Sequence, residues 1–162
     1  EWVPITDSIA AERSTREQGA QRGAAQLSRG EGMWYHDNTV FISSTDGGPD
    51  SLGQIFRLDI DRTGRPDRLT LIAQSESRKT LDSPDNLTVS PTGQLFIAED
   101  GSAPNLIRVL DQNNNLVPFA RNALNDGTSE FTGICFSLDG RWLFVNLQTE
   151  GLTLAIWGPF VS

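Results

Sequence analysis

Residues 82–101 read DSPDNLTVSPTGQLFIAEDG: two short apolar runs, a turn between them and acidic residues at both outer ends. Short runs that flank a Pro-Thr-Gly turn are typical of two antiparallel strands in a hairpin. Carboxylates repel one another when a fold gathers them. The stretch therefore predicts a β-hairpin, and it raises the question of what compensates the charge at its ends.

The same pattern of strand, tight turn and aromatic-containing strand occurs three times. It is carried by EGMWYHDNTVFISSTDGG, DNLTVSPTGQLFIAEDG and FTGICFSLDGRWLFVNLQTEG. The aromatic strands begin at positions 40, 95 and 143, which are 55 and 48 residues apart. A period of this size is typical of a four-stranded propeller blade.

The rest of the chain fits a mainly β fold with one short N-terminal helix. A helix is predicted over 14–26, because Ser14 and Glu17 form a capping box. Gly19 and Gly23 share one face of that helix, so we expect it to lie flat on the rest of the protein. No second helix is predicted, which favours antiparallel meanders over βαβ units. Strands are expected near 33–36, 39–44, 54–60, 69–75, 86–90, 95–99, 105–110, 116–120, 132–137, 142–148 and 152–157.

The domain expected from this pattern is a single partial propeller over 1–162. It comprises a helix-containing N-terminal segment over 1–30 and about three blades over 31–162. Propellers close with roughly four to eight blades. The chain also begins with Glu rather than Met. We therefore expect the missing blades to come from the N-terminal part of a longer protein, which is the favoured interpretation, or from a second copy.

Composition excludes several classes of function. The chain of 162 residues has 13 Lys and Arg against 21 Asp and Glu, a net charge of -8. A nucleic-acid surface needs a basic patch instead. The longest apolar stretch is far short of the ~18 residues that span a bilayer, and no leader peptide is visible. The motifs of a serine nucleophile elbow, a P-loop and a dinucleotide-binding loop are absent.

Several single residues have ordinary structural interpretations. The one cysteine, Cys135, lies between apolar neighbours and is expected to be a buried thiol. The one histidine, His36, stands beside a turn and is expected at the surface. The tryptophans are expected to pack between strands rather than to bind a ligand; they are Trp2, Trp34, Trp142 and Trp157.

An acidic residue recurs just ahead of the innermost strand of each repeat: Glu31, Asp85 and Glu130. In a propeller these strands line a shared channel, so the three carboxylates are expected to meet there. Calcium suits such a site, because it takes six to eight oxygen ligands in flexible geometry. Asn86 offers a neutral carbonyl oxygen beside Asp85. A bound cation would also permit hydrolysis by a metal-bound water.

Other polar residues end the neighbouring strands and are further candidates for the same site: Asp46, Glu99, Asp100 and Asn146. An alternative stays open for all of these positions, because Asp and Asn beside strands are also ordinary turn residues. That alternative is strongest for Asp46 and Asp100, each of which precedes a glycine.

Seven ordered segments resemble the C-terminal portion of the PhoX-type alkaline phosphatases. They are GAQRGAAQLSRGEG, RGEGMWYHDNTVFISSTDGG, GQIFRLDI, LDSPDNLTVSPTGQLFIAEDG, VPFARN, SEFTGICFSLDGRWLFVNLQ and GLTLAIWGP. The resemblance covers nearly the whole chain. It implies a six-bladed propeller that is usually exported, to the periplasm or the extracellular space. It also implies a central site that holds calcium and iron (Ca²⁺ and Fe³⁺) and hydrolyses small phosphate monoesters.

The resemblance also implies site residues, though it assigns no catalytic residue here. The acidic positions of the family's metal centre are matched by Glu31, Asp85, Glu99 and Glu130, and less closely by Asn86, Asp46 and Asp100. Arg29 and Arg121 are expected either to face substrate phosphate, which guanidinium groups bind well, or to be solvated at the surface.

The family's iron site uses a cysteine thiolate from the propeller's N-terminal part. Nothing in this sequence corresponds to that cysteine, and Cys135 is not given the role. We therefore expect this chain alone to be incomplete and nearly inactive.

Two alternatives remain beside the phosphatase. SPDNLTVSPTG also resembles the regucalcin- and gluconolactonase-like calcium-dependent propeller hydrolases. The third possibility is a non-catalytic propeller fragment that binds calcium.

Overall fold

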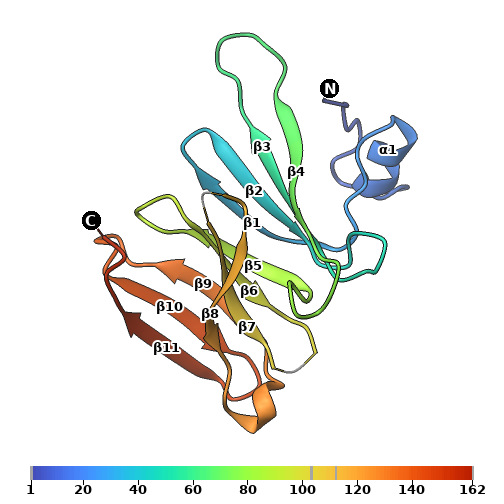
Figure 1. Cartoon of the computed structure of the whole chain (residues 1–162). Helices are drawn as coiled ribbons and strands as arrows, with labels where there is room; N and C mark the ends of the chain where they lie inside the picture. Colours follow the sequence, from blue (N-terminus) through green and yellow to red (C-terminus); the bar gives the residue numbers. More distant parts are fainter. Residues whose placement is uncertain (1, 103, 112, 162) are drawn as a thin grey trace.

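The computed structural model describes residues 2–102, 104–111 and 113–161. Its eleven strands form three antiparallel sheets (Figure 1). The first sheet has the order β1-β2-β3-β4, with β1 at Gly30–His36, β2 at Thr39–Ser44, β3 at Gln54–Asp59 and β4 at Arg68–Gln74. The second has the order β5-β6-β7-β8, with β5 at Pro84–Val89, β6 at Leu95–Glu99, β7 at Leu106–Leu110 and β8 at Leu116–Arg121.

The third sheet has three strands in the order β11-β10-β9. They are β9 at Phe131–Phe136, β10 at Trp142–Leu147 and β11 at Leu152–Trp157. A short 3-10 helix at Asn125–Gly127 precedes β9. The prediction of a mainly β protein with one short α-helix is confirmed, and each predicted strand coincides with an observed one to within a few residues.

The three repeats of the sequence occupy equivalent places. Phe41, Phe96 and Phe144 lie in β2, β6 and β10, the second strand of each sheet. The first strands are neighbours, since β5 packs against β1 on one side and β9 on the other. Residues about 50 positions apart in the sequence are therefore brought to one line of inner strands.

Two apolar cores hold the sheets together. One lies between the first and second sheets and includes Ile55, Leu87 and Ile97. The other lies between the second and third sheets, where Phe96 makes edge-on contacts with Phe136 and Phe160 at ring-centre distances of 5.2 and 6.1 Å. Each fully buried aliphatic or aromatic side chain stabilises the fold by about 1.5–3 kcal/mol. These cores fix the inner strands relative to one another.

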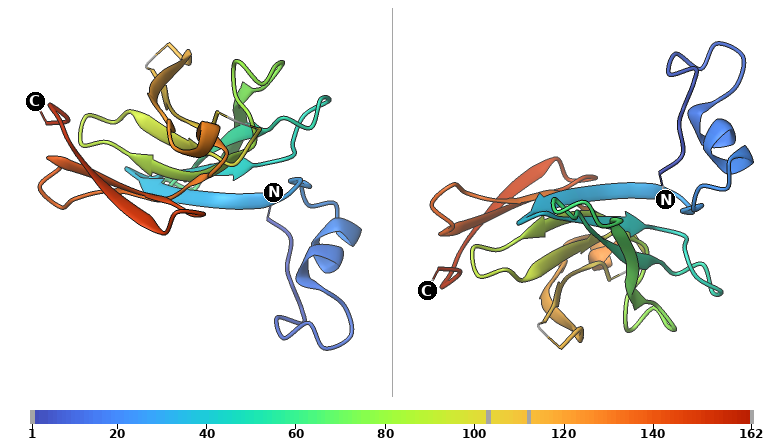
Figure 2. Two further views of the ribbon diagram at one scale, coloured as in Figure 1. Left: turned by 90° about the horizontal axis from the view of Figure 1, so that it is seen from below. Right: turned by 90° about the horizontal axis from the view of Figure 1, so that it is seen from above.

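Helix α1, at Thr15–Gln21, is shorter than predicted and does not pack on the sheets as expected. Ser14 and Glu17 form the expected capping box. The helix ends early, and Gly23, at φ 78°, takes a conformation that few residues other than glycine adopt. Instead of lying flat on the sheets, the N-terminal segment projects away from them (Figure 2). A side chain at Gly19 would meet Ile5 and Ala24 of its own segment, so the expected close approach of another backbone is wrong.

The outer strand of the third sheet is unusually exposed. β3 and β7, which hold the same place in the other sheets, are mostly buried or half-buried, whereas β11 alternates between exposed and half-buried residues. Trp157 is 71 % exposed and pairs with the exposed Trp142. Of the four tryptophans, only Trp34 packs against a core as expected.

Candidate metal centre

Four carboxylates lie at one end of the inner strands. Glu31 belongs to β1 and Asp85 to β5, while Glu130 directly precedes β9 and Asp100 directly follows β6. The hairpin β5–β6 thus brings both ends of the stretch 82–101 to this place, between Glu31 on one side and Glu130 on the other. We call these four residues the acidic cluster.

The carboxylates of the acidic cluster act on one another electrostatically. Partial burial raises the pKa of Asp85, and the negative charges of Glu31 and Asp100 raise it further. The pKa of Glu130 is raised to about 7 by burial, by a hydrogen bond with Asp100 and by the negative charge of Asp100. Smaller contributions to the pKa of Glu130 come from Asp85 and Glu31. Negative charges on neighbouring acids thus contribute to the raised pKa values of Asp85 and Glu130, and a nearby positive charge would relieve this repulsion.

Arg29 supplies the positive charge nearest to the acidic cluster. Its Nη2 lies 3.5 Å from Glu31 Oε1 and 3.9 Å from Asp100 Oδ2. Its Nη1 lies 3.2 Å from Asp46 Oδ1. These carboxylates raise the pKa of Arg29, with Asp46 as the largest cause. Because Arg29 and its partners are 37–50 % exposed, solvent screens each pair, which therefore adds little stability.

Bulges in the inner strands turn the acids toward this place. The register of β1 shifts between Gly30 and Met33, on either side of Glu31. The register of β5 shifts between Pro84 and Leu87, on either side of Asp85. A bulge re-aims side chains at a strand end and leaves backbone groups without ladder partners. The same irregularity thus accompanies both acids.

Asn86 joins the second sheet to the third. Its side-chain oxygen accepts hydrogen bonds from the Thr132 hydroxyl, at 3.0 Å, and from the Gly133 backbone N–H. Its amide nitrogen donates to Asp85 Oδ1 at 3.2 Å. Asn86 thus lies beside the acidic cluster, and its oxygen is engaged in the contact between β5 and β9.

Glu99 has other partners than the acidic cluster. It is 1 % exposed, and its carboxylate accepts hydrogen bonds from Arg108 Nε and from the backbone N–H groups of Asp82 and Leu106. Burial raises the pKa of Glu99, while Arg108 and these N–H groups lower it. Both carboxylate oxygens are occupied inside the second sheet. Of the two adjacent acids at the end of β6, it is Asp100 that joins the acidic cluster.

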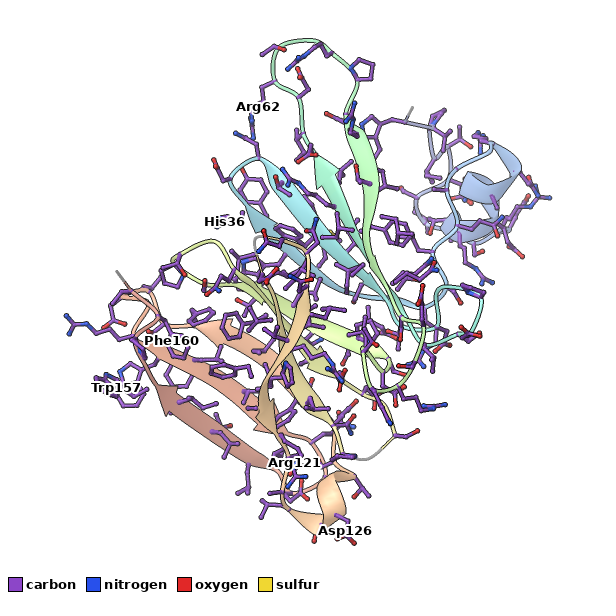
Figure 3. All side chains as sticks on the ribbon, in the orientation of Figure 1. His36, Arg62, Arg121, Asp126, Trp157 and Phe160 are labelled. Carbon is purple, nitrogen blue, oxygen red and sulfur yellow. The ribbon has the colours of Figure 1, made fainter. Side chains whose placement is uncertain are left out.

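Arg121 lies apart from Arg29. It ends β8, the outermost strand of the second sheet, which is three strand spacings or roughly 14 Å from β5. Figure 3 shows it near Asp126, far from His36 at the outer end of β1. Arg121 and His36 are both exposed. Of the two arginines expected to face phosphate, only Arg29 accompanies the acids.

The donors present suit a hard cation. Carboxylate oxygens are the ligands that calcium prefers. Within residues 2–102, 104–111 and 113–161, no three His, Cys, Asp or Glu side chains are arranged so that they could hold an ion directly. The half-buried Cys135 lies five residues beyond Glu130 on β9, roughly 16 Å along the strand. The chain thus supplies carboxylate oxygens, but these would have to move closer together to bind one ion. Arg29 lies between two of them, Glu31 and Asp100.

The clearest concave surfaces lie elsewhere. One of about 780 Å³ follows the β3–β4 hairpin, from Asp59 to Leu69. Another of about 430 Å³ lies between the first two sheets and includes Phe41, Arg57 and Leu110. Neither includes a residue of the acidic cluster.

Comparison with known proteins identifies the family of this chain. The model of the alkaline phosphatase PhoX family matches residues 1–151. The chain belongs to the PhoX alkaline phosphatase family. The resemblance found in the sequence motifs is thereby confirmed, and phosphatase chemistry on a small-molecule phosphate is the activity that the PhoX family suggests. A search of curated proteins found no match to the chain. Neither described helix has the length and apolarity that crossing a membrane requires.

Proposed function

We propose that this chain supplies part of the active site of a metal-dependent phosphatase that hydrolyses phosphate monoesters. The observation that carries the proposal is that Glu31, Asp85, Asp100 and Glu130, from three sheets, act on one another in a PhoX-family chain, with Arg29 paired to Glu31 and Asp100. A site that gathers four acids, and in which the pKa values of Asp85 and Glu130 are raised, is suited to cations.

The three sheets are proposed to be blades of a six-bladed propeller. Their first strands are adjacent and their second strands carry equivalent aromatic residues, as rotation about a common axis requires. The whole of 1–162 is then one partial propeller domain. The remaining blades come from the rest of the polypeptide or from a second copy of this chain, and they complete the channel around the acidic cluster.

The proposed cofactors are calcium and iron. Glu31, Asp85, Asp100 and Glu130 are the oxygen donors offered to calcium by this chain, and the iron also requires a thiolate from outside it. Bound cations polarise a phosphoryl group and lower the pKa of a water molecule that attacks it. Asn86 keeps Asp85 in place through its amide hydrogen bond. Glu99 holds the end of β6, from which Asp100 projects.

Arg29 is the proposed phosphate-binding residue of this chain. In the structure its guanidinium is shared among Glu31, Asp46 and Asp100. Once cations neutralise these carboxylates, the guanidinium is released to a substrate phosphate, whose oxygens it matches in pairs. Because the PhoX phosphatases are usually exported, the proposed location is the periplasm or the extracellular space.

Hydrolysis of p-nitrophenyl phosphate tests the function. The protein that contains this chain is expected to hydrolyse the ester with calcium present and to lose the activity with a chelator. The isolated chain of 162 residues is expected to be nearly inactive. Lactone opening without phosphatase activity would indicate a gluconolactonase-like enzyme instead. Calcium binding with neither activity in the complete protein would indicate a non-catalytic propeller.

A further inference from the structure

Ser43 on β2 connects the two bulged strands that carry Glu31 and Asp85. Its side chain is fully buried. Its hydroxyl accepts a hydrogen bond from the Gly32 backbone N–H at 2.7 Å and donates to the Asp85 carbonyl oxygen at 2.6 Å. One hydroxyl thus bridges the residue after Glu31 to the backbone of Asp85.

Thr45, directly after β2, makes a second connection at the same level. It is fully buried, and its hydroxyl donates to the Pro84 carbonyl oxygen at 2.8 Å. Its backbone N–H donates to the Arg29 carbonyl oxygen at 2.9 Å. Ser43 and Thr45, the hydroxyl pair, therefore hold Arg29 and Gly32 on one side and Pro84 and Asp85 on the other.

The bulges explain why this junction uses side-chain hydroxyls. A bulge leaves backbone groups without a partner in the sheet ladder. A buried N–H or C=O without a partner is costly, so the sequence must supply one. Ser43 supplies both a donor and an acceptor with a single atom.

The sheet itself does not demand a hydroxyl at this position. Ser43 follows the Val40-Phe41-Ile42 run, and the corresponding residues of the other sheets are Ala98 in β6 and Asn146 in β10. Ala98 is fully buried opposite the bulge of β5, so the second strand of a sheet can face such a bulge without a hydroxyl. The junction between the second and third sheets relies on Asn86 instead. The hydroxyl pair therefore belongs to the junction that presents Glu31, Asp85 and Arg29.

We propose that the hydroxyl pair positions the carboxylates of Glu31 and Asp85, and thereby sets the affinity of the centre for calcium. This inference rests on the proposed metal-dependent function. Ser43 and Thr45 do not touch the ion or the substrate; they act through the backbone of Gly32, Pro84 and Asp85. Their loss lets β1 and β5 shift relative to each other, so that the two acids no longer meet the ion together.

Isothermal titration calorimetry of the metal-free protein with CaCl₂ tests this role. Ser43→Ala and Thr45→Val each remove one hydroxyl with little change in shape. Each is expected to weaken calcium binding about tenfold, as the loss of one buried hydrogen bond implies. Ser75→Ala is the matched control, because Ser75 is equally buried and its hydroxyl bonds the carbonyls of Ser77 and Leu81, in the connection after β4.

The metal-free melting temperature separates positioning from general damage. Ser75→Ala is expected to lower it as much as Ser43→Ala does, with calcium affinity kept within twofold of the unsubstituted protein. Equal losses of calcium affinity in all three variants, or none in Ser43→Ala and Thr45→Val, would overturn the positioning role. If Ser43→Ala does not fold, Thr45→Val decides by the same comparison. An unsubstituted protein that binds no calcium would instead reject the metal centre, and the positioning role with it.

Discussion

Gly32 on β1 leaves no room for a side chain beside Asp85 on β5. A methyl group at Gly32 would overlap the backbone carbonyl oxygen of Asp85 and press on the backbone of Asn86 and Leu87. The two inner strands therefore approach each other closely where they carry Glu31 and Asp85. The first two sheets can approach each other this closely because position 32 has no side chain.

Gly32→Ala is accordingly expected to destabilise the protein by about 1–3 kcal/mol, the usual cost of overpacking, and to weaken calcium binding. Urea unfolding measures the first effect and calorimetry the second. Gly30→Ala is the control, because a methyl group at Gly30 on the same strand meets nothing within 4 Å. Equal stability and calcium affinity in both variants would contradict the close approach.

Glu31→Gln is expected to reduce calcium affinity at least tenfold, because it removes one negative charge from the acidic cluster. Glu76→Gln is the matched control. Glu76 is exposed in the connection between β4 and β5, away from the other acids. Titration calorimetry at one ionic strength compares the two variants. Indistinguishable affinities would exclude Glu31 from the metal centre.

The stability of the metal-free protein is expected to fall as the pH rises from 5 to 8. Folding raises the pKa of Glu130 from 4.5 to about 7, so the folded state holds a proton that the unfolded state has released. Between these values stability decreases with pH, and above about pH 7 the decrease is complete. The raised pKa of Asp85 acts in the same direction. Acids with lowered pKa values, such as Asp61 at about 2, titrate below this window.

Melting temperatures at pH 5 and pH 8 check this dependence. Glu130→Gln should reduce the difference between them, and so should saturating calcium, which replaces the proton as the compensating charge. Glu76→Gln should leave the difference unchanged. A metal-free protein that is more stable at pH 8 than at pH 5 would show that the carboxylates do not repel one another.

Arg108→Met is expected to cost about 3–5 kcal/mol of stability, because it leaves Glu99 as an unpaired charge inside the second sheet. The side chains of this pair are 3 % and 1 % exposed. Arg57→Ala breaks the exposed pair with Asp59 and is expected to cost about 1 kcal/mol or less. Urea unfolding of both variants gives the comparison. A small loss for Arg108→Met would mean that Glu99 is readily rehydrated.

The strands were predictable because their signals are local. Turns such as Pro91-Thr92-Gly93 end each apolar run, and Gly93 indeed has a positive φ of 83°. The recurrence of Glu31, Asp85 and Glu130 was also visible, since equivalent positions of a repeat occupy equivalent places. The packing of helix α1 was not predictable, because nothing in the spacing of Gly19 and Gly23 states which segment they face.

The side-chain partners inside the sheets could not be read from the sequence either. Glu99 and Asp100 are adjacent acids at the end of one strand, and the pattern does not say which of them joins the acidic cluster. The choice depends on Arg108, a single basic residue in the apolar strand LIRVL. From β7, the strand next to β6, it forms an ion pair with Glu99. The hydroxyl pair was missed for the same reason, although the Ser-Ser-Thr run that follows the apolar residues Val40-Phe41-Ile42 was a visible signal.

The exposed rim of β11 has a practical consequence for handling the protein. None of the other described strands pairs with its outer side, and the indole of Trp157 stands there in solvent. Unpaired edge strands favour edge-to-edge association between molecules. Tryptophan fluorescence shifts to shorter wavelength when an indole leaves water, so covering this edge of the sheet would shift the contribution that Trp157 makes to the emission of the four tryptophans.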